Sequence, residues 1–344
     1  MCEANYFYIR CGKKQIKQFN HADEYFLLIY FSKAKTTYFY FMKFDLTILG
    51  SSSATPTNER HPSAQVLNID DELFLIDCGE GTQMQMRKFK VKFQRINHIF
   101  ISHLHGDHYL GLAGLLFTYH LLGRTKELHV YANSELQEII EKQLQVSGTT
   151  LIFPLVFHSL PENKPHHLYE NKKISISCFP LLHRVPTHGF IFRQKHCERN
   201  IIKNKITELN IPVNKIPEIK NGSDFTDAKG KKHSNAELIM EPSPEKVYVY
   251  CSDTGYCPKI VPFFKNADIL YHEATFMHDM EERANAKQHS TTVHAATIAK
   301  KAHVKKLIIG HYSARYDELE PVLKETQNVF SNTEIAEEGK IYSV

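Results

Sequence analysis

The stretch from His98 to Leu116 holds four side chains of types that bind metal ions, all within six positions. They are His103, His105, Asp107 and His108, and they follow a short apolar run with β propensity. Imidazole and carboxylate ligands at the end of a strand suit zinc or a similar divalent metal. In an extended loop, His103 and His105 point the same way. A turn at Gly106 would send Asp107 and His108 towards a second ion.

A solvated histidine-rich loop is the alternative interpretation of this stretch. The apolar strand before it, and the apolar helix expected from Tyr109 onwards, argue against that alternative. Other predicted strands also end at a histidine or an aspartate, namely at His183, Asp253, His272 and His311. Loops at the same end of parallel strands converge in space, so these residues are candidates for the same site.

Alternating strands and helices without an internal repeat predict a layered α/β domain. The expected strands are 44–49, 64–69, 73–76, 99–101, 127–131, 173–179, 189–193, 246–251, 268–271 and 305–309. The expected helices are 83–88, one from 109, 134–146, 293–302 and 319–329. A turn at Asp70-Asp71 should join the second and third strands, and Ser290 or Thr291 should cap the helix 293–302.

The run Ser102–His108 resembles the signature of the metallo-β-lactamase superfamily. Within that resemblance, His103, His105 and His183 are candidates to hold one ion, while Asp107, His108 and His311 would hold the other. Asp253 would bridge the two. Two such ions can stabilise both the attacking and the leaving oxygen of a phosphodiester.

The composition of the chain limits which classes of protein it can belong to. The chain has 344 residues, 42% of them hydrophobic, which is ample for a large core. Seven scattered cysteines without a Cys-x-x-Cys pair argue against a disulfide framework and fit a reducing cytoplasm. No apolar run is long enough to span a membrane. The formal charge of +4 includes +3 from residues 1–41, so whole-chain charge gives no argument for nucleic-acid binding.

Residues 1–41 differ in character from the rest, being rich in Tyr, Phe and Lys without clear periodicity. They do not resemble a signal peptide. We expect them to be a non-native or disordered extension, with the catalytic domain at 42–344. A genuine disordered or membrane-touching extension is the alternative.

Later motifs resemble the tRNase Z (ribonuclease Z) family in its short form, over about 42–344. They are Pro180-Leu181-Leu182-His183, Ser252-Asp253-Thr254, His272-Glu273-Ala274-Thr275, His289-Ser290-Thr291-Thr292 and Gly310-His311-Tyr312. The resemblance implies a four-layer αββα sandwich with an inserted flexible arm, two Zn²⁺ per subunit and a homodimer. It implies a cytoplasmic endoribonuclease that removes the 3′ trailer of precursor tRNA, with neither a membrane nor DNA as partner.

By the same resemblance, Asp107 would be the general base for the attacking water as well as a metal ligand. His289 would protonate the leaving 3′ oxygen, and Glu273 would orient His289. An imidazole can donate a proton near neutral pH, and a carboxylate partner favours its charged form.

Residues 194–246 match the position of the family's tRNA-gripping arm. From Arg193 to Lys232 there are ten Lys/Arg and five acidic residues, a local net charge of +5. Phosphate contacts need only placed cations. The candidate contacts are Lys203, Lys205, Lys231 and Lys232, together with Arg60 in an early loop that lies near the tRNA 3′ end in the family; a solvated loop is the alternative for the arm.

Two rival functions remain open at this point. A phosphodiesterase for small esters would need the same metals but no basic arm. A non-catalytic RNA-binding subunit would not need the complete ligand set.

Overall fold

The computed structural model describes residues 7–11, 14–19, 26–31, 36–41, 43–195, 199–242 and 244–344. The chain divides into two compact units. One combines Met1–Lys43 with Lys195–Glu245, and the other combines Phe44–Gln194 with Lys246–Val344. The second, larger unit contains every predicted metal ligand, so it is described first.

The larger unit is built on two sheets of seven strands each. In sheet order, the first contains β10 (Leu155–Ser159), β9 (Leu128–Ala132), β8 (Ile96–Phe100), β7 (Glu72–Ile76), β6 (Ala64–Ile69), β5 (Phe44–Gly50) and β22 (Ile341–Ser343). The second contains β11 (His166–Glu170), β12 (Ile174–Pro180), β13 (His188–Gln194), β18 (Val247–Cys251), β19 (Ile269–Glu273), β20 (Lys306–Gly310) and β21 (Thr333–Ile335).

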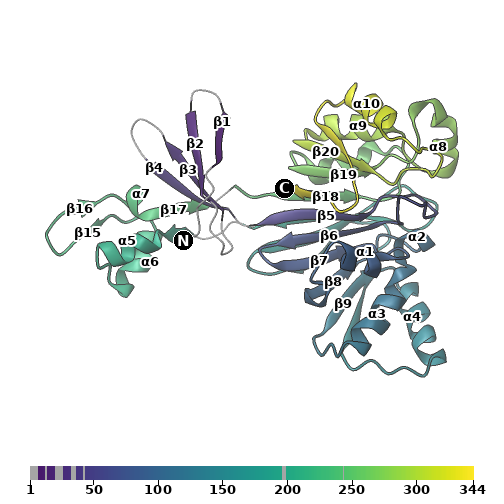
Figure 1. Ribbon diagram of the computed structural model, residues 1–344, viewed down its shortest axis with the longest axis horizontal. Helices are drawn as coiled ribbons and strands as arrows, with labels where there is room; N and C mark the ends of the chain where they lie inside the picture. Colours follow the sequence, from purple (N-terminus) through teal and green to yellow (C-terminus); the bar gives the residue numbers. More distant parts are fainter. Residues whose placement is uncertain are drawn as a thin grey trace. The chain divides into compact units, whose positions relative to one another are not determined.

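Helices cover the outer face of each sheet (Figure 1). The first sheet carries α1 (Thr82–Lys88), α3 (Gly111–Leu121) and α4 (Glu135–Val146), and the second carries α8 (Glu281–Lys287), α9 (Thr292–Ala302) and α10 (Glu320–Gln327). Each helix layer shares a buried apolar cluster with its sheet. Aromatic rings fill the space between the sheets, as where Phe100 meets Phe192 edge-on at 5.4 Å. The predicted αββα sandwich is therefore confirmed.

Local sequence signals explain several element boundaries. Asp70 and Asp71 both have positive φ, 47° and 67°, which is the tight hairpin turn expected between β6 and β7. Thr291 caps α9 by accepting a hydrogen bond from the backbone of His294, as predicted. The apolar helix expected from Tyr109 onwards begins at Gly111, as α3, and a separate short helix before it, α2 (Gly106–Tyr109), includes Asp107 and His108.

Parallel pairing brings the ligand-bearing loops to one edge of the sandwich. In the first sheet β7, β8 and β9 run parallel, and in the second β18, β19 and β20 run parallel. The carboxyl ends of parallel strands meet at the same edge. Asp253, Glu273 and His311 each lie at, or within two residues of, such a strand end.

The smaller unit contains the predicted arm. Its short elements are β14 (Asn200–Ile201), α5 (Lys203–Glu208), α6 (Ile216–Lys220), β15 (Phe225–Thr226), β16 (Lys232–His233), α7 (Asn235–Leu238) and β17 (Ile239–Pro242). Five side chains form a small buried cluster, namely Ile201, Ile211, Ile219, Phe225 and Leu238. The arm thus has an apolar core of its own, which the sequence had not indicated.

The N-terminal segment contributes four strands to this smaller unit. They are β1 (Phe7–Cys11), β2 (Lys14–Phe19), β3 (Phe26–Phe31) and β4 (Thr36–Phe41), and β4 pairs in parallel with β17. The rest of 1–41 lies outside the described residues. That this segment is a non-native or disordered extension stays a prediction. Within the described parts of the chain, no helix is long and apolar enough to cross a membrane.

Candidate metal centre

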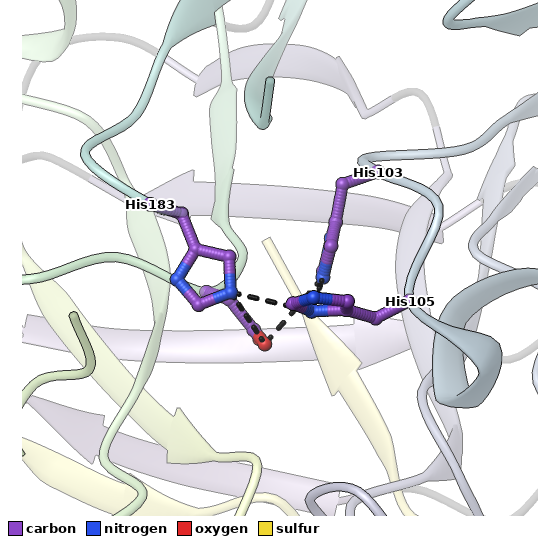
Figure 2. A group of neighbouring side chains, drawn as sticks. His103, His105 and His183 are labelled. Atoms are coloured by element: carbon purple, nitrogen blue, oxygen red, sulfur yellow. Dashed lines mark hydrogen bonds and ion pairs between the residues drawn. The ribbon is translucent and has the colours of Figure 1, made fainter. Parts of the chain in front are cut away.

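Three imidazole nitrogens converge at the first cluster (Figure 2). Nδ1 of His105 lies 3.0 Å from Nε2 of His103 and 3.3 Å from Nε2 of His183. Three basic nitrogens this close repel one another unless a proton or a cation lies between them. Asp253 completes the group, with Oδ2 at 3.6 Å from His103 and 3.8 Å from His183. The predicted first ligand set is therefore assembled.

The second cluster lies on the other side of the Asp253 carboxylate. Nε2 of His311 is 3.3 Å from Oδ2 of Asp107 and 3.2 Å from Oδ1 of Asp253. Nε2 of His108 is 3.5 Å from the same Asp107 oxygen and 3.4 Å from the same Asp253 oxygen. Asp253 thus turns one oxygen to each cluster, which is the arrangement of a bridging ligand.

The residues present fit two divalent ions. Nε2 of His108 and Oδ1 of Asp253 are buried and make no hydrogen bond. A buried polar atom without a partner is costly, and a metal ion would satisfy both atoms. The three histidines and a carboxylate of one cluster, and the two histidines with carboxylates of the other, are donor sets that zinc accepts.

Hydrogen bonds from outside the clusters hold the histidines in position. Nδ1 of His183 donates to the carbonyl of Gln288 at 2.8 Å, and Nδ1 of His108 donates to Asp77 at 2.8 Å. The Thr275 hydroxyl donates to Glu273, so it accepts a hydrogen bond from Nδ1 of His311 at 2.9 Å. In all three rings the Nε2 atom is left free for a metal, because the partner fixes the tautomer.

For His103 and Asp107, electrostatics favour the protonation states that bind metal. Burial and the neighbouring His108 hold the pKa of His103 well below its usual range, which keeps the ring neutral. Burial alone would raise the pKa of Asp107, but His108 and His311 outweigh it and hold that pKa below its ordinary value. A neutral imidazole and an ionised carboxylate are the forms that coordinate metal.

A second pair lies beside the clusters. Nδ1 of His289 donates to Oε1 of Glu273 at 2.9 Å, and Nδ1 also lies 4.0 Å from Oδ2 of Asp253. Burial disfavours the imidazolium, yet Glu273 more than compensates, and the pKa of His289 rises to about 9. Glu273 itself is fully buried and accepts hydrogen bonds from the backbone of Thr254, Thr275 and Ser290. Its carboxylate is therefore fixed in place.

Sequence reasoning missed the role of Asp77. Its fully buried carboxylate accepts hydrogen bonds from Ser102, His108 and Tyr250, at 2.6–2.9 Å. Asp77 also lies a few residues before α1, but that helix is capped by Gly81 without a side-chain hydrogen bond. The sequence feature that could have indicated this role is the position of Asp77 directly after β7, at the same sheet edge as the ligand loops.

The residues predicted to contact tRNA lie in different parts of the structure. Arg60 is 8% exposed, and its Nη2 donates to the carbonyl of Tyr316 at 2.8 Å. This bond ties the early loop to the segment after β20. The lysines predicted to bind tRNA, Lys203, Lys205, Lys231 and Lys232, all belong to the smaller unit. Their contacts with RNA, and that of Arg60, stay predictions.

A pocket of about 360 Å³ opens over the two clusters. Asp107, Asp253, His105 and His289 line it, together with parts of the early loop. The candidate metal ligands and the candidate acid His289 both face this open space. A substrate in the pocket could therefore contact the metal clusters and His289 at the same time.

Together, the sandwich and this site define an enzyme of the metallo-β-lactamase fold. A metallo-β-lactamase fold protein from Bacillus subtilis matches with a TM-score of 0.62 at 18% identity, over 88% of this chain and 100% of that one, which supports the fold alone. Ribonuclease Z of Bacteroides fragilis is 43% identical over 302 residues, covering 88% of this chain and 99% of the relative. The chain belongs to the ribonuclease Z family.

A solved structure agrees with this assignment, and a family model of another description matches part of the chain. The solved structure of human tRNase Z, short form, has a TM-score of 0.64 at 28% identity, covering 87% of this chain and 99% of that one. The family model described as Anti-Pycsar protein Apyc1 matches residues 44–202. That match includes the ligands up to His183 but ends before Asp253, Glu273, His289 and His311.

Proposed function

We propose that this chain is a zinc-dependent endoribonuclease that removes the 3′ trailer from precursor tRNA and leaves a 3′-hydroxyl on the tRNA. The observation that carries the proposal is the His289–Glu273 pair beside two clusters that share Asp253. Relatives named ribonuclease Z, and a human structure named tRNase Z, support the substrate.

In this mechanism, each proton has a residue to receive or supply it. Asp107 is ionised and accepts a proton from the water whose oxygen attacks the phosphorus. As the bond between phosphorus and the ribose 3′ oxygen breaks, Nε2 of His289 gives a proton to that oxygen. Glu273 holds the opposite nitrogen of the ring and stabilises its charged form. Two zinc ions, when bound, would add positive charge that stabilises the phosphate in the transition state.

The direct experiment uses precursor tRNAs with and without an encoded CCA. The ends of the products should be a 3′-hydroxyl on the tRNA and a 5′-phosphate on the trailer. A protein that hydrolyses simple phosphodiesters yet leaves precursor tRNA intact would be the small-ester phosphodiesterase instead.

For the cofactor, we propose two zinc ions per subunit. This proposal is supported by the two groups of candidate ligands and by the position of Asp253 between them. Metal analysis should give close to two ions per chain, and Asp253→Ala should lower the occupancy of both sites. Asp279→Ala, at an exposed aspartate outside the pocket, is the matched control. One ion in the active protein, with no change in Asp253→Ala, would overturn this proposal.

We also propose a homodimer, through the surface of α3 and α4. Helix α3 is largely apolar, and a groove of about 960 Å³ between the two helices is lined by Phe117, Ile139 and Val146. Leu121 and Val146 are 80% and 77% exposed. Exposed apolar surface of this kind marks protein interfaces. Sedimentation should report a dimer, and charged substitutions at Leu121 and Val146 should give monomers.

We place the enzyme in the cytoplasm, with precursor tRNA as its partner and neither membrane nor DNA. Cys78, Cys178, Cys251 and Cys257 are unpaired, as in proteins of reducing compartments. We assign tRNA gripping to the arm because its lysines supply cations for phosphate contacts. Arg60 remains a candidate contact near the tRNA 3′ end.

A further inference from the structure

Among the residues that line the pocket over the metal clusters, Arg184 is the only arginine or lysine. The pocket walls also carry the carboxylates Asp107, Asp253 and Glu80 and the imidazoles His105 and His289. An arginine beside three carboxylates would ordinarily form an ion pair with one of them. Within the described residues, however, the Arg184 guanidinium makes no hydrogen bond or ion pair, and the side chain is exposed.

The backbone around Arg184 is held firmly. Leu182 donates its N–H to the Thr254 hydroxyl at 3.1 Å and accepts a hydrogen bond from the N–H of Gly255 at 2.8 Å. The next residue, His183, is tied to the carbonyl of Gln288. Arg184 follows directly and is close enough to His105 to interact with it electrostatically. Its position in the pocket wall is therefore set by the same contacts that place a metal ligand.

Two other exposed arginines of the larger unit, Arg95 and Arg315, already have partners. Arg95 donates to the carbonyl of Asp71 at 2.6 Å, and the Arg315 guanidinium lies over the Phe276 ring at 5.2 Å. Arg184 differs in having a fixed base, free donors and an open pocket in front of it. A planar guanidinium presents paired donors that match the oxygens of a phosphate.

We propose that Arg184 binds the backbone phosphate next to the scissile phosphate, and so makes the site select an RNA strand over an isolated phosphodiester. This inference rests on the proposed function. The scissile phosphate must lie at the ligand clusters, where Asp107 and His289 can reach its reacting oxygens. A pocket of about 360 Å³ lies at the small end of ligand sites. The strand must therefore continue past its wall, where Arg184 stands.

The first test compares Arg184→Ala, Arg184→Lys and the unchanged protein on precursor tRNA and on bis(p-nitrophenyl) phosphate. Arg184→Ala should lower kcat/KM for precursor tRNA by about ten- to a hundredfold, the value of a charge-assisted hydrogen bond. The loss on the small diester should be at least tenfold smaller. The slope of log kcat/KM against log salt should decrease by about 0.7 in Arg184→Ala, but not in Arg184→Lys, because one contact to a single strand is lost.

Arg95→Ala is the matched control, because it removes the same charge at the opposite end of β8, away from the ligand loop. It should leave both activities and the salt slope unchanged. Equal losses on both substrates in Arg184→Ala, or an unchanged salt slope, would overturn the assignment. If the unchanged protein does not cleave precursor tRNA at all, the proposed function fails instead, so the two failures are distinguishable.

The second test locates the phosphate. Neutral methylphosphonates are placed one at a time at the linkages flanking the scissile bond. At one flanking linkage the neutral substitution should slow the unchanged protein but add nothing to the loss in Arg184→Ala. Additive losses at every flanking linkage would show that Arg184 contacts none of these phosphates. Unchanged melting temperature and metal content in the variants would exclude a general structural effect.

Discussion

Nδ1 of His289 lies 2.9 Å from Oε1 of Glu273, so the ring's other nitrogen, Nε2, is the one available to a substrate. Glu273 has no freedom to turn away, because backbone N–H groups from three segments hold its carboxylate. The pair is therefore a fixed proton donor beside the metal ligands.

His289→Ala should keep its metals and still bind precursor tRNA, yet cleave it about 10²–10⁴-fold more slowly. The physical reason is that the 3′ oxygen would have to leave as an alkoxide. A nitrophenyl phosphodiester should lose much less, since its leaving oxygen needs no proton, and Glu273→Ala should show the same pattern more weakly. His166→Ala, at an exposed histidine of β11, serves as control. Loss of metal, or equal slowing of both substrates, would make His289 a ligand or a structural residue.

Asp77→Asn should weaken metal binding about 10–100-fold with little change in shape. The amide cannot accept hydrogen bonds from Ser102, His108 and Tyr250 as the carboxylate does, so the orientation of His108 is lost. Competition with a chelator measures the affinity. Asp71→Asn makes the same chemical change at the other end of β7 and should bind metal normally. Equal affinities in the two variants would contradict the role of Asp77.

Reversing the charge of Lys203, Lys205, Lys231 and Lys232 to Glu should weaken precursor tRNA binding and flatten its salt dependence. Lys205 and Lys232 pair with Glu208 and Asp224 at 2.7 and 3.0 Å, whereas Lys203 and Lys231 form no ion pair among the described residues. The pair Lys203→Glu/Lys231→Glu should therefore have the larger effect of the two pairs.

Filter binding at several salt concentrations measures both the affinity and the slope. Lys126→Glu, an exposed change before β9 in the larger unit, should leave both unaltered. An unchanged slope in the quadruple variant would remove these lysines from the RNA-binding surface.

His98 should make the fold sensitive to acid. It lies between the sheets, with Tyr169 at 4.2 Å and His129 at 5.0 Å between ring centres. Burial, then His129 and His158, lower the pKa of His98 from 6.5 to about 3. Between these values the unfolded chain binds the extra proton, so stability is full above pH 6.5 and falls as the pH drops towards 3. At pH 5 the loss is about 2 kcal/mol.

Urea unfolding at pH 8 and pH 5 measures this effect. His98→Phe should lose about 2 kcal/mol less than the unchanged protein between the two pH values, whatever the metal ligands contribute. His166→Phe, on the surface, should behave like the unchanged protein. Parallel pH profiles for His98→Phe and the unchanged protein would show that His98 is not the sensitive group.

The sequence allowed prediction of what depends on local spacing. The first four ligands form a compact motif, namely His103, His105, Asp107 and His108, and the later candidates follow apolar strand patterns. The ligand positions and the sandwich could therefore be predicted from the sequence. Asp77 was not, because its partner Tyr250 is 173 positions away. Arg60 looks in sequence like an exposed cation, but its bond to Tyr316 spans 256 positions. The arm's core was missed because its elements are too short to show periodicity.

The ligands of the metal centre come from both sheets, and they are synthesised at different times. Residues 103–108 follow β8 of the first sheet, whereas His183, Asp253 and His311 follow strands of the second, and β22 near the end of the chain pairs with β5. During translation, the first four ligands emerge long before the last. A chain interrupted before residue 311 would lack one ligand of the second cluster. It would also lack β22, the edge strand of the first sheet. Nuclease activity would thus require synthesis to continue past β22, and fragments that end before residue 311 would be inactive.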